Sequence, residues 1–504
     1  MVSKVSTVAF HGIETLSVTV EVQMSSGLPA FYVVGLGDKA VAESRERVRA
    51  SFHHLGLSLP SKRITVNLAP ADMQKEGSHY DLPIALGLMV FMNILDPLDV
   101  ARFSAVGELG LDGTLAQVVG ILPAAINASA NNRGLICPQS GGREAAWAGD
   151  LPILAAPSLL SIINHFKGIQ VLSPPEHSPF PSFNKTGMDM KDVKGQDIPK
   201  RALEIAASGG HNLLMIGPPG SGKSMLARRL PGILPPFEPM EALETTMIHS
   251  LAGLLPEEGL ITERPFRDPH HSSSLVALVG GGARTKPGEI SLAHNGVLFL
   301  DEFPEFARAT LESLRQPLET GQIVVARANN HVTYPARIQL IAAMNPCRCG
   351  YFGDADRQCH KVPRCAGDYQ GKISGPLMDR FDLVVSVQEV KATQLLEESD
   401  GESSHDVALR VAHARDLQKK RSTHPKGLTI LNAVIDGEQL EDVVVLESDG
   451  RQLLSTAIDK MRLSARGYHR ILRVSRTIAD LDDSPSVCRH HIAEALRYRQ
   501  SLSL

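Results

Sequence analysis

The sequence is sparing with cysteine, lacks any long apolar run and carries little net charge. Six of its 504 residues are cysteines, and four of these fall between positions 347 and 365. No apolar run approaches the roughly 20 residues that cross a bilayer, and the first residues, MVSKVSTVAFHGIETLSV, lack the apolar core of a signal peptide. We therefore expect a protein of the reducing cytoplasm, without a membrane segment, in which a disulfide knot is disfavoured.

The charge balance restricts the partners. A net charge of −4 does not suit a protein coated in positive potential. It still permits local basic patches that contact phosphates, so nucleic-acid binding has to be argued from particular sites.

The chain divides into segments that differ in composition and in the pattern of predicted strands and helices. At 504 residues it exceeds one ordinary core, so two or three domains are expected. Strand-like and helix-like runs alternate over residues 1–170, which predicts a compact α/β domain. A Pro- and Ser-rich stretch follows, and we assign 171–190 as a linker. Alternating helices and short apolar strands over 191–390 predict a parallel sheet covered by helices, and 391–504 is expected to be mainly helical.

The strongest local signal is HNLLMIGPPGSGKSMLARRL, in which an apolar strand-like run leads into a glycine-rich loop and then a helical pattern. This is a full P-loop match in its required context of strand, loop and helix. Glycines let backbone N–H groups surround phosphates, Lys223 supplies a cation to the β and γ oxygens, and Ser224 can ligate Mg²⁺. The predicted ATP-binding residues are Gly217, Pro218, Pro219, Gly220, Ser221, Gly222, Lys223 and Ser224.

A second motif, GVLFLDE, supplies two acids at the end of a strand. Its apolar residues predict a buried strand, and Asp301 and Glu302 emerge at the end of it. Asp301 is expected to orient Mg²⁺, and Glu302 to act as the general base that activates the attacking water. Such a strand is common in isolation, but together with the P-loop it makes NTP hydrolysis the expected reaction.

These motifs resemble the AAA+ ATPases, and within them the group of magnesium-chelatase subunit I and the ComM/YifB-type proteins. The blocks GQDIPKRALEIAASGG, RPFRDPHHSSS, KPGEISLAHNGVLFLDE, AAMNPCRCGY, SGPLMDRFDL and RLSARGYHRILRVSRTIADL occur in family order along almost the whole chain. The resemblance implies an α/β fold with three parts: an N-terminal ribosomal-protein-S5-like (Lon-protease-like) domain, an AAA+ P-loop ATPase core with a helix-2 insert, and a C-terminal helical lid.

The resemblance also implies roles for three further residues. Asn345 in AAMNP resembles the sensor-1 residue that positions water at the γ-phosphate, although Asn-Pro is also a common turn. Arg380 in MDRFD resembles the arginine finger that reaches the ATP of a neighbouring subunit, and its alternative is an ion pair with Asp379 or Asp382. Arg466 in LSARGYHR resembles the sensor-2 arginine of the lid. A finger in trans implies a homo-oligomeric ring, for which a hexamer is the family expectation.

Two segments are candidates for contact with DNA. The P-loop and the acid pair lie far enough apart to require an insertion, which residues 240–282 should supply. In the resembled family this is the helix-2 insert, a hairpin that lines the pore of the ring. A second hairpin is predicted over 321–340. Its Arg327, His331 and Arg337 either contact a phosphate backbone or form an ordinary solvated face.

Residues 67–123 resemble the protease domain of Lon-type enzymes, but not at its catalytic positions. His79 stands where those enzymes have their serine nucleophile, and Leu122 stands where they have a lysine base. An aliphatic side chain cannot accept a proton, so Ser78 next door is not expected to act as a shifted nucleophile. We expect a non-proteolytic scaffold or a DNA-binding module.

The clustered cysteines leave two alternatives open. The cluster consists of Cys347, Cys349, Cys359 and Cys365. Their spacing is not that of a standard zinc finger, but four thiolates can close tetrahedrally on Zn²⁺ in a structural site. Free thiols in a surface loop are the alternative. The pair His270 and His271 is expected to cap a turn or to pack, because adjacent histidines do not easily share an ion.

Three functions are compatible with these features. An ATP-driven ring motor on DNA would be a branch-migration helicase in recombination or natural transformation. A chelatase-like motor would remodel a partner complex, and a Lon-like enzyme would degrade proteins. The residues at 79 and 122 disfavour the protease. We favour the DNA motor over the chelatase, because an S5-like domain fused to the motor is characteristic of ComM/YifB-type proteins.

Overall fold

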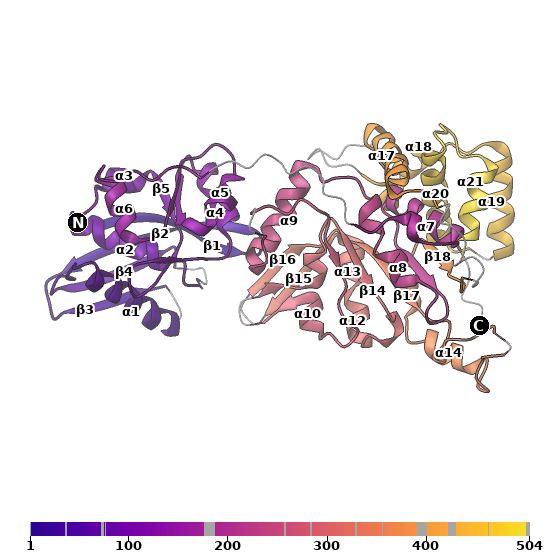
Figure 1. Cartoon of the computed structure of the whole chain (residues 1–504), viewed down its shortest axis with the longest axis horizontal. Coiled ribbons are helices and arrows are strands. Elements are labelled where there is room, and N and C mark those ends of the chain that lie inside the picture. Colours follow the sequence, from indigo (N-terminus) through magenta and orange to yellow (C-terminus); the bar gives the residue numbers. More distant parts are fainter. Residues whose placement is uncertain are drawn as a thin grey trace.

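The molecule has three parts that follow one another along its long axis (Figure 1). This computed structural model describes residues 2–35, 38–71, 75, 77–175, 187–256, 259–282, 285–327, 330–354, 356–390, 401–421, 430–461 and 463–499. Most of the expected linker lies outside the described residues, as does the start of the expected lid at 391–400. The domain boundaries therefore stay predictions.

The N-terminal part is built on a seven-stranded mixed sheet of order β3-β4-β2-β1-β5-β8-β9. The strands β1, β2 and β4 pair antiparallel, and the other neighbours pair parallel. Their bounds are β1 Val2–His11, β2 Glu14–Ser25, β3 Ala30–Val34, β4 Arg63–Ala69, β5 Phe103–Ala105, β8 Gly134–Pro138 and β9 Ile153–Ala156. A separate short pair joins β6 (Glu108–Leu109) to β7 (Leu115–Ala116).

Helices cover this sheet. The helix α2 (Asp81–Phe91) is buried along almost its whole length, as its apolar sequence DLPIALGLMVF requires. The others are α1 Asp38–His54, α3 Pro97–Ala101, α4 Ile121–Ala130, α5 Gly142–Ala146 and α6 Leu159–Phe166. A helix-covered sheet of this kind agrees with the expected α/β domain.

The central part contains a five-stranded parallel sheet of order β11-β14-β17-β10-β18. Its strands are β10 Leu213–Ile216, β11 Phe266–Arg267, β14 Val297–Leu300, β17 Gln339–Met344 and β18 Leu383–Ser386. The inner strands are apolar except for Gln339 and almost wholly buried, as expected of a parallel sheet that is covered on both faces. Since parallel strands end at the same edge, the P-loop, the acid pair and the expected sensor meet there.

The helices of the central part are α7 Asp197–Gly209, α8 Lys223–Ala227, α9 Pro239–Ala252, α10 Leu275–Val279, α11 Glu289–Leu292, α12 Arg308–Ser313, α13 Arg315–Thr320, α14 Arg364–Gln370 and α15 Gly375–Met378. A short hairpin and the strand β11 place the insert differently from the sequence prediction. The hairpin of β12 (Gly280–Gly281) and β13 (Lys286–Pro287) lies between α10 and α11. It runs past position 282, whereas β11 within 240–282 is a strand of the main sheet. The predicted bounds of the insert are therefore wrong, because a two-residue edge strand leaves no periodic signal.

The second hairpin is confirmed. The strands β15 (Gln322–Arg327) and β16 (Asn330–Pro335) pair antiparallel, with Arg327 opposite Asn330. The tip of the β1–β2 hairpin rests on it, since a Cβ added at Gly12 would lie 2.8 Å from the carbonyl oxygen of Thr333. The N-terminal part thus touches the hairpin that precedes the expected sensor.

The C-terminal part is helical, as expected. Its helices are α17 Ser404–Arg421, α18 Glu438–Val443, α19 Ser448–Met461, α20 Ala465–Leu481 and α21 Arg489–Arg497. Both α17 and α20 pack on α7, so this part shares a core with the sheet. Among the described helices, none has the length and apolarity to cross a membrane. The expected fold class, α/β with a parallel-sheet core and a helical C-terminal part, is confirmed.

Candidate functional site

The predicted phosphate loop joins the end of β10 to the start of α8. Gly220 and Gly222 have φ of +78° and +92°, a backbone region that favours glycine. A Cβ at Gly217 would lie 2.1 Å from the carbonyl oxygen of Val387, so this position is closed to larger residues. The loop therefore keeps the bare backbone that close approach of phosphate requires.

Lys223 links this loop to the end of β17. Its Nζ donates to the carbonyl oxygens of Gly217 and Pro218, each at 2.8 Å, and lies 3.3 Å from Oδ1 of Asn345. Burial lowers the pKa of Lys223, and the nearby carboxylate of Asp301 opposes that shift. The structure thus brings the P-loop lysine, the strand-end acid and the expected sensor into one site.

The strand-end acid also contacts the loop serine. Ser224 Oγ donates to Oδ2 of Asp301 at 2.5 Å, and the backbone N–H of Glu302 donates to Oδ1 of Asp301 at 2.8 Å. A hydroxyl and a carboxylate side by side form the kind of oxygen donor set that Mg²⁺ takes in nucleotide sites. The residues present therefore fit a magnesium ion bound together with phosphate.

Glu302 has a partner that the sequence did not suggest. Its carboxylate lies 3.0 Å from Nδ1 of His271, and its backbone has φ +51°. The neighbouring His270 instead caps a turn, with Nδ1 2.8 Å from Oγ of Ser272, which confirms turn capping for that histidine alone. No spacing rule links positions 271 and 302, because the contact joins different segments of the fold.

Gln196 is a second residue that the sequence did not single out. Its side-chain amide donates to the carbonyl oxygen of Ser221 at 3.3 Å and also to that of Gln388. A cavity of about 530 Å³ adjoins it, lined in part by Ile198, Val385 and Tyr498. The only available signal was its place in the GQDIPKRALEIAASGG block, ahead of the P-loop.

Arg380 lies within a group of arginines. It pairs with Glu319 of α13, and its side chain is only 11% exposed. The alternative pairing with Asp379 or Asp382 is wrong, because both acids lie against Arg470. Burial lowers the pKa of the Arg380 guanidinium, and the positive charges of Arg466, Arg315 and Arg470 add to that shift.

Arg466 is exposed in the first turn of α20. Its positive charge acts on Arg380, so the expected finger and the expected lid arginine lie near one another. Their roles in ATP hydrolysis stay predictions.

The basic residues of the second hairpin are not equivalent. Arg337 forms an ion pair with Glu244 of α9, whereas His331 is exposed. The side chain of Arg327 lies outside the described residues. The ion pair shows that Arg337 is already engaged within the chain, and His331 keeps both of its alternatives.

The protease-like positions lack the serine and lysine of Lon-type enzymes. His79 is buried, its Nε2 lies 3.0 Å from the carbonyl oxygen of Val8, and Leu122 is buried in α4. Ser78 donates a hydrogen bond to Glu108. A histidine used for packing and an aliphatic residue at the base position support the non-proteolytic prediction.

His79 should make stability depend on pH. Burial lowers its pKa to about 4, against about 6.5 in an unfolded chain. Its contribution to stability is therefore present above pH 6.5 and lost as the pH falls towards 4, about 2 kcal/mol of it by pH 5. We expect His79→Gln, which does not titrate, to remove this loss. Denaturant unfolding followed by Trp147, the single tryptophan, measures it, and an unchanged pH dependence in the variant would contradict the assignment.

The clustered cysteines converge beside the nucleotide site. The sulfur atoms of Cys347 and Cys349 are 3.0 Å apart, and those of Cys347, Cys349 and Cys365 lie within 4.8 Å of one another. The Cys359 thiol interacts with those of Cys349 and Cys365. The hydrogen bond from Cys347 lowers the pKa of Cys349 to about 6, and burial raises that of Cys347 to about 11.

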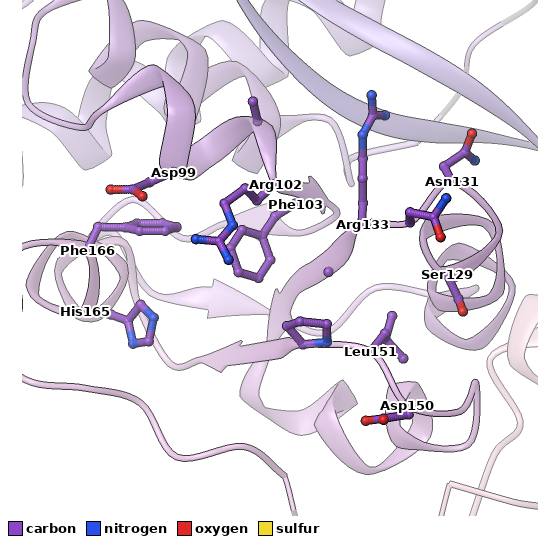
Figure 2. A pocket seen from close by; sticks show the side chains of 14 residues that line it. Asp99, Arg102, Phe103, Ser129, Asn131, Arg133, Asp150, Leu151, His165 and Phe166 are labelled. Atoms are coloured by element: carbon purple, nitrogen blue, oxygen red, sulfur yellow. The ribbon is translucent and has the colours of Figure 1, made fainter.

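A cavity of about 670 Å³ opens in the N-terminal part, away from these groups (Figure 2). Figure 2 shows two arginines, Arg102 and Arg133, among its lining side chains together with Asp99 and Asp150. Charges of both signs therefore line the cavity. None of the residues predicted from the sequence to form a site lines it.

Three family profiles match the chain in succession. The profile for magnesium chelatase, subunit ChlI, matches residues 189–395. A profile described as subunit ChlI of Mg-chelatase matches 20–141, and one for the ChlI C-terminal region matches 401–499. The same family therefore accounts for the P-loop region and for most of the sequence on either side of it.

Individual relatives differ in how much of the chain they cover. Competence protein ComM of Haemophilus influenzae is 43% identical over 501 residues, which is 98% of this chain and 97% of its own. The magnesium-chelatase 38 kDa subunit of Rhodobacter capsulatus is 25% identical over 60% of this chain and 83% of its own. DNA replication licensing factor mcm6 of Dictyostelium discoideum is 24% identical over 59% of this chain and 31% of its own.

Proposed function

This chain belongs to the ComM/YifB family of magnesium-chelatase-like AAA+ ATPases, and on that basis we propose that it is an ATP-driven motor acting on DNA. Within that proposal it works as a cytoplasmic homo-oligomeric ring, with six subunits as the family expectation. Its expected activity is branch migration in recombination or natural transformation. The observation that carries the proposal is the likeness to a competence protein over 98% of the chain, N-terminal part included.

The reaction at the site is ATP hydrolysis. The loop from Gly217 to Ser224 would hold the phosphates, with Lys223 exchanging its present carbonyl partners for phosphoryl oxygens. The cavity beside Gln196 would receive the adenine ring of ATP. Glu302 would take the proton of the attacking water, while Asn345 orients that water.

Ser224 and Asp301 would hold Mg²⁺, which supplies a Lewis acid that neutralises charge on the phosphoryl oxygens. Arg380 and Arg466 would stabilise the charge that develops on the transferred group. For Arg380 this requires exchange of its Glu319 partner for a phosphate of the neighbouring subunit. A phosphate would supply the counter-charge that this buried guanidinium, surrounded by Arg466, Arg315 and Arg470, requires.

DNA is the polymer on which we expect the motor to act. The two hairpins of the central part lie together, since Tyr334 of β16 donates to the carbonyl oxygen of Thr285, next to β13, at 2.7 Å. Exposed His331 and Lys286 belong to these hairpins and are candidates to contact a phosphate backbone. The likeness to a DNA replication licensing factor over 59% of the chain also supports this substrate.

A chelatase-like ATPase that remodels a partner complex is the alternative. Two observations favour this alternative. All three family profiles are named for a magnesium chelatase subunit, and the match to the Rhodobacter capsulatus chelatase subunit extends over 83% of that subunit's own length. That subunit covers only 60% of this chain, whereas the competence protein covers 98%. We therefore prefer the DNA motor.

One experiment separates these functions. ATP hydrolysis is measured alone, with blunt duplex DNA and with forked or three-stranded DNA, together with displacement of a labelled strand. We expect branched DNA to raise the hydrolysis rate and the strand to be displaced only when ATP is hydrolysed, with Glu302→Gln as the inactive control. Hydrolysis that no DNA stimulates, with no strand displaced, would contradict the DNA motor.

A further inference from the structure

Four thiols from separate parts of a loop meet beside the P-loop. Cys347 and Cys349 directly follow β17, Cys359 lies in the loop, and Cys365 is in the first turn of α14. All six cysteines of the chain are free. Three of the four cluster and the fourth interacts with two of these, over the 19 residues from 347 to 365, a tertiary feature that a solvated loop of free thiols does not require.

The sulfur atoms lie close enough together for one metal ion to bind them with small side-chain adjustments. Zinc bound to four thiolates at about 2.3 Å holds neighbouring sulfurs about 3.8 Å apart. Here the sulfurs of Cys347 and Cys349 are 3.0 Å apart, and those of Cys347, Cys349 and Cys365 lie within 4.8 Å of one another. The fourth, Cys359, lies outside that group of three and interacts with the thiols of Cys349 and Cys365.

Backbone N–H groups also point at the sulfurs. Those of Gly350 and Phe352 approach Cys347, that of Tyr351 approaches Cys349, and that of Lys361 approaches Cys359. Donors aimed at sulfur stabilise thiolates and orient metal ligands. Gly350 permits the turn, since its φ is +89°.

We propose that Cys347, Cys349, Cys359 and Cys365 form a tetrathiolate zinc site that fixes the position of the P-loop. Four protein ligands leave no open coordination position, so the metal is structural. A Cβ added at Gly350 would lie 2.6 Å from Cδ of Pro219, so the cysteine loop rests directly on the phosphate loop. In Figure 1 the segment that carries α14 projects from the sheet, and zinc would brace it from within.

The cysteine loop is also tied to the expected sensor. Pro346 separates Asn345 from Cys347, and its carbonyl oxygen accepts a hydrogen bond from Gln370 of α14 at 2.8 Å. Loss of the metal would loosen both the sensor and the wall of the P-loop. This effect on ATP rests on the proposed function, whereas metal binding by the four thiols does not.

Metal content of the full-length chain, purified under reducing conditions and resupplied with Zn²⁺, tests the site. We expect about one zinc per chain in the parent and in Cys488→Ser, whose cysteine lies outside the cluster, and loss of zinc in Cys349→Ser and Cys365→Ser. Replacement by Co²⁺ should show the thiolate-to-metal absorption of a sulfur-ligated tetrahedral site. A parent chain that holds no zinc after resupply, or a Cys349→Ser chain that keeps it, would overturn the proposal.

The coupling to the P-loop is tested on the same proteins. In Cys365→Ser with unchanged circular dichroism, we expect kcat for ATP hydrolysis to fall roughly tenfold or more, because small displacements of positioning groups are costly. Equal kcat in the zinc-bound parent and the zinc-free variant would overturn the coupling. Absence of hydrolysis in a zinc-bound parent would instead contradict the proposed ATPase and leave the metal site standing, so the two failures are distinguishable.

Discussion

Arg380→Ala is expected to lower kcat for ATP hydrolysis about 10³-fold or more in the assembled protein, the range in which arginine fingers act. Binding of a nucleotide analogue should stay nearly unchanged, because the P-loop contacts of Lys223 and Ser224 lie in the same subunit. The measurement is steady-state hydrolysis alongside analogue affinity. A residual rate within a few-fold of the parent would refute the finger.

The ion pair with Glu319 offers an internal control. If Arg380 only holds α13 in place, Glu319→Ala should impair hydrolysis as much as Arg380→Ala does. If Arg380 acts on ATP, Glu319→Ala should leave most of the activity, since it frees the guanidinium. Equal losses in the two variants would assign Arg380 to structure.

A mixing experiment tests whether the arginine acts in trans. Chains with Arg380→Ala and chains with Lys223→Ala should each be inactive alone. In an equal mixture about one interface in four joins an intact P-loop to an intact arginine, so part of the activity should return. Mixtures as inactive as their components would place Arg380 in its own subunit's site.

Glu302→Gln should lower kcat by about 10² to 10⁴, because an amide cannot accept the proton of the attacking water. Glutamine has the same shape and can still bond to His271, so the site should keep its geometry and its affinity for ATP. Tight nucleotide binding without turnover is therefore the expected phenotype, measured by analogue affinity and single-turnover hydrolysis.

Glu305→Gln is the matched control for this variant. Glu305 lies three residues further on and pairs with Lys372. Its substitution should leave kcat within a few-fold of the parent. A comparable loss in both variants would mean that negative charge at this edge of the sheet, and not a base, is what hydrolysis needs.

The parts of the site that could be predicted are those that one short segment encodes. The P-loop was recognisable because strand, glycine turn and helix follow within a few residues, and Asp301 because an apolar strand leads directly to it. The class of the fold followed from the same alternation of strands and helices. Where the signal was short, as in the two-residue β11, prediction failed and the bounds of the insert were misplaced.

The sequence by itself determined the nucleotide loop, the strand-end acids and the absence of a serine and lysine pair at positions 78, 79 and 122. Only the tertiary structure decided that His271 meets Glu302, that Arg380 rests on Glu319, and that four cysteines meet beside Pro219. The physical reason is the separation along the chain over which each kind of interaction acts. Periodicity and turn chemistry act between near neighbours in the chain, whereas these contacts join segments that only the packing of helices on the sheet brings together.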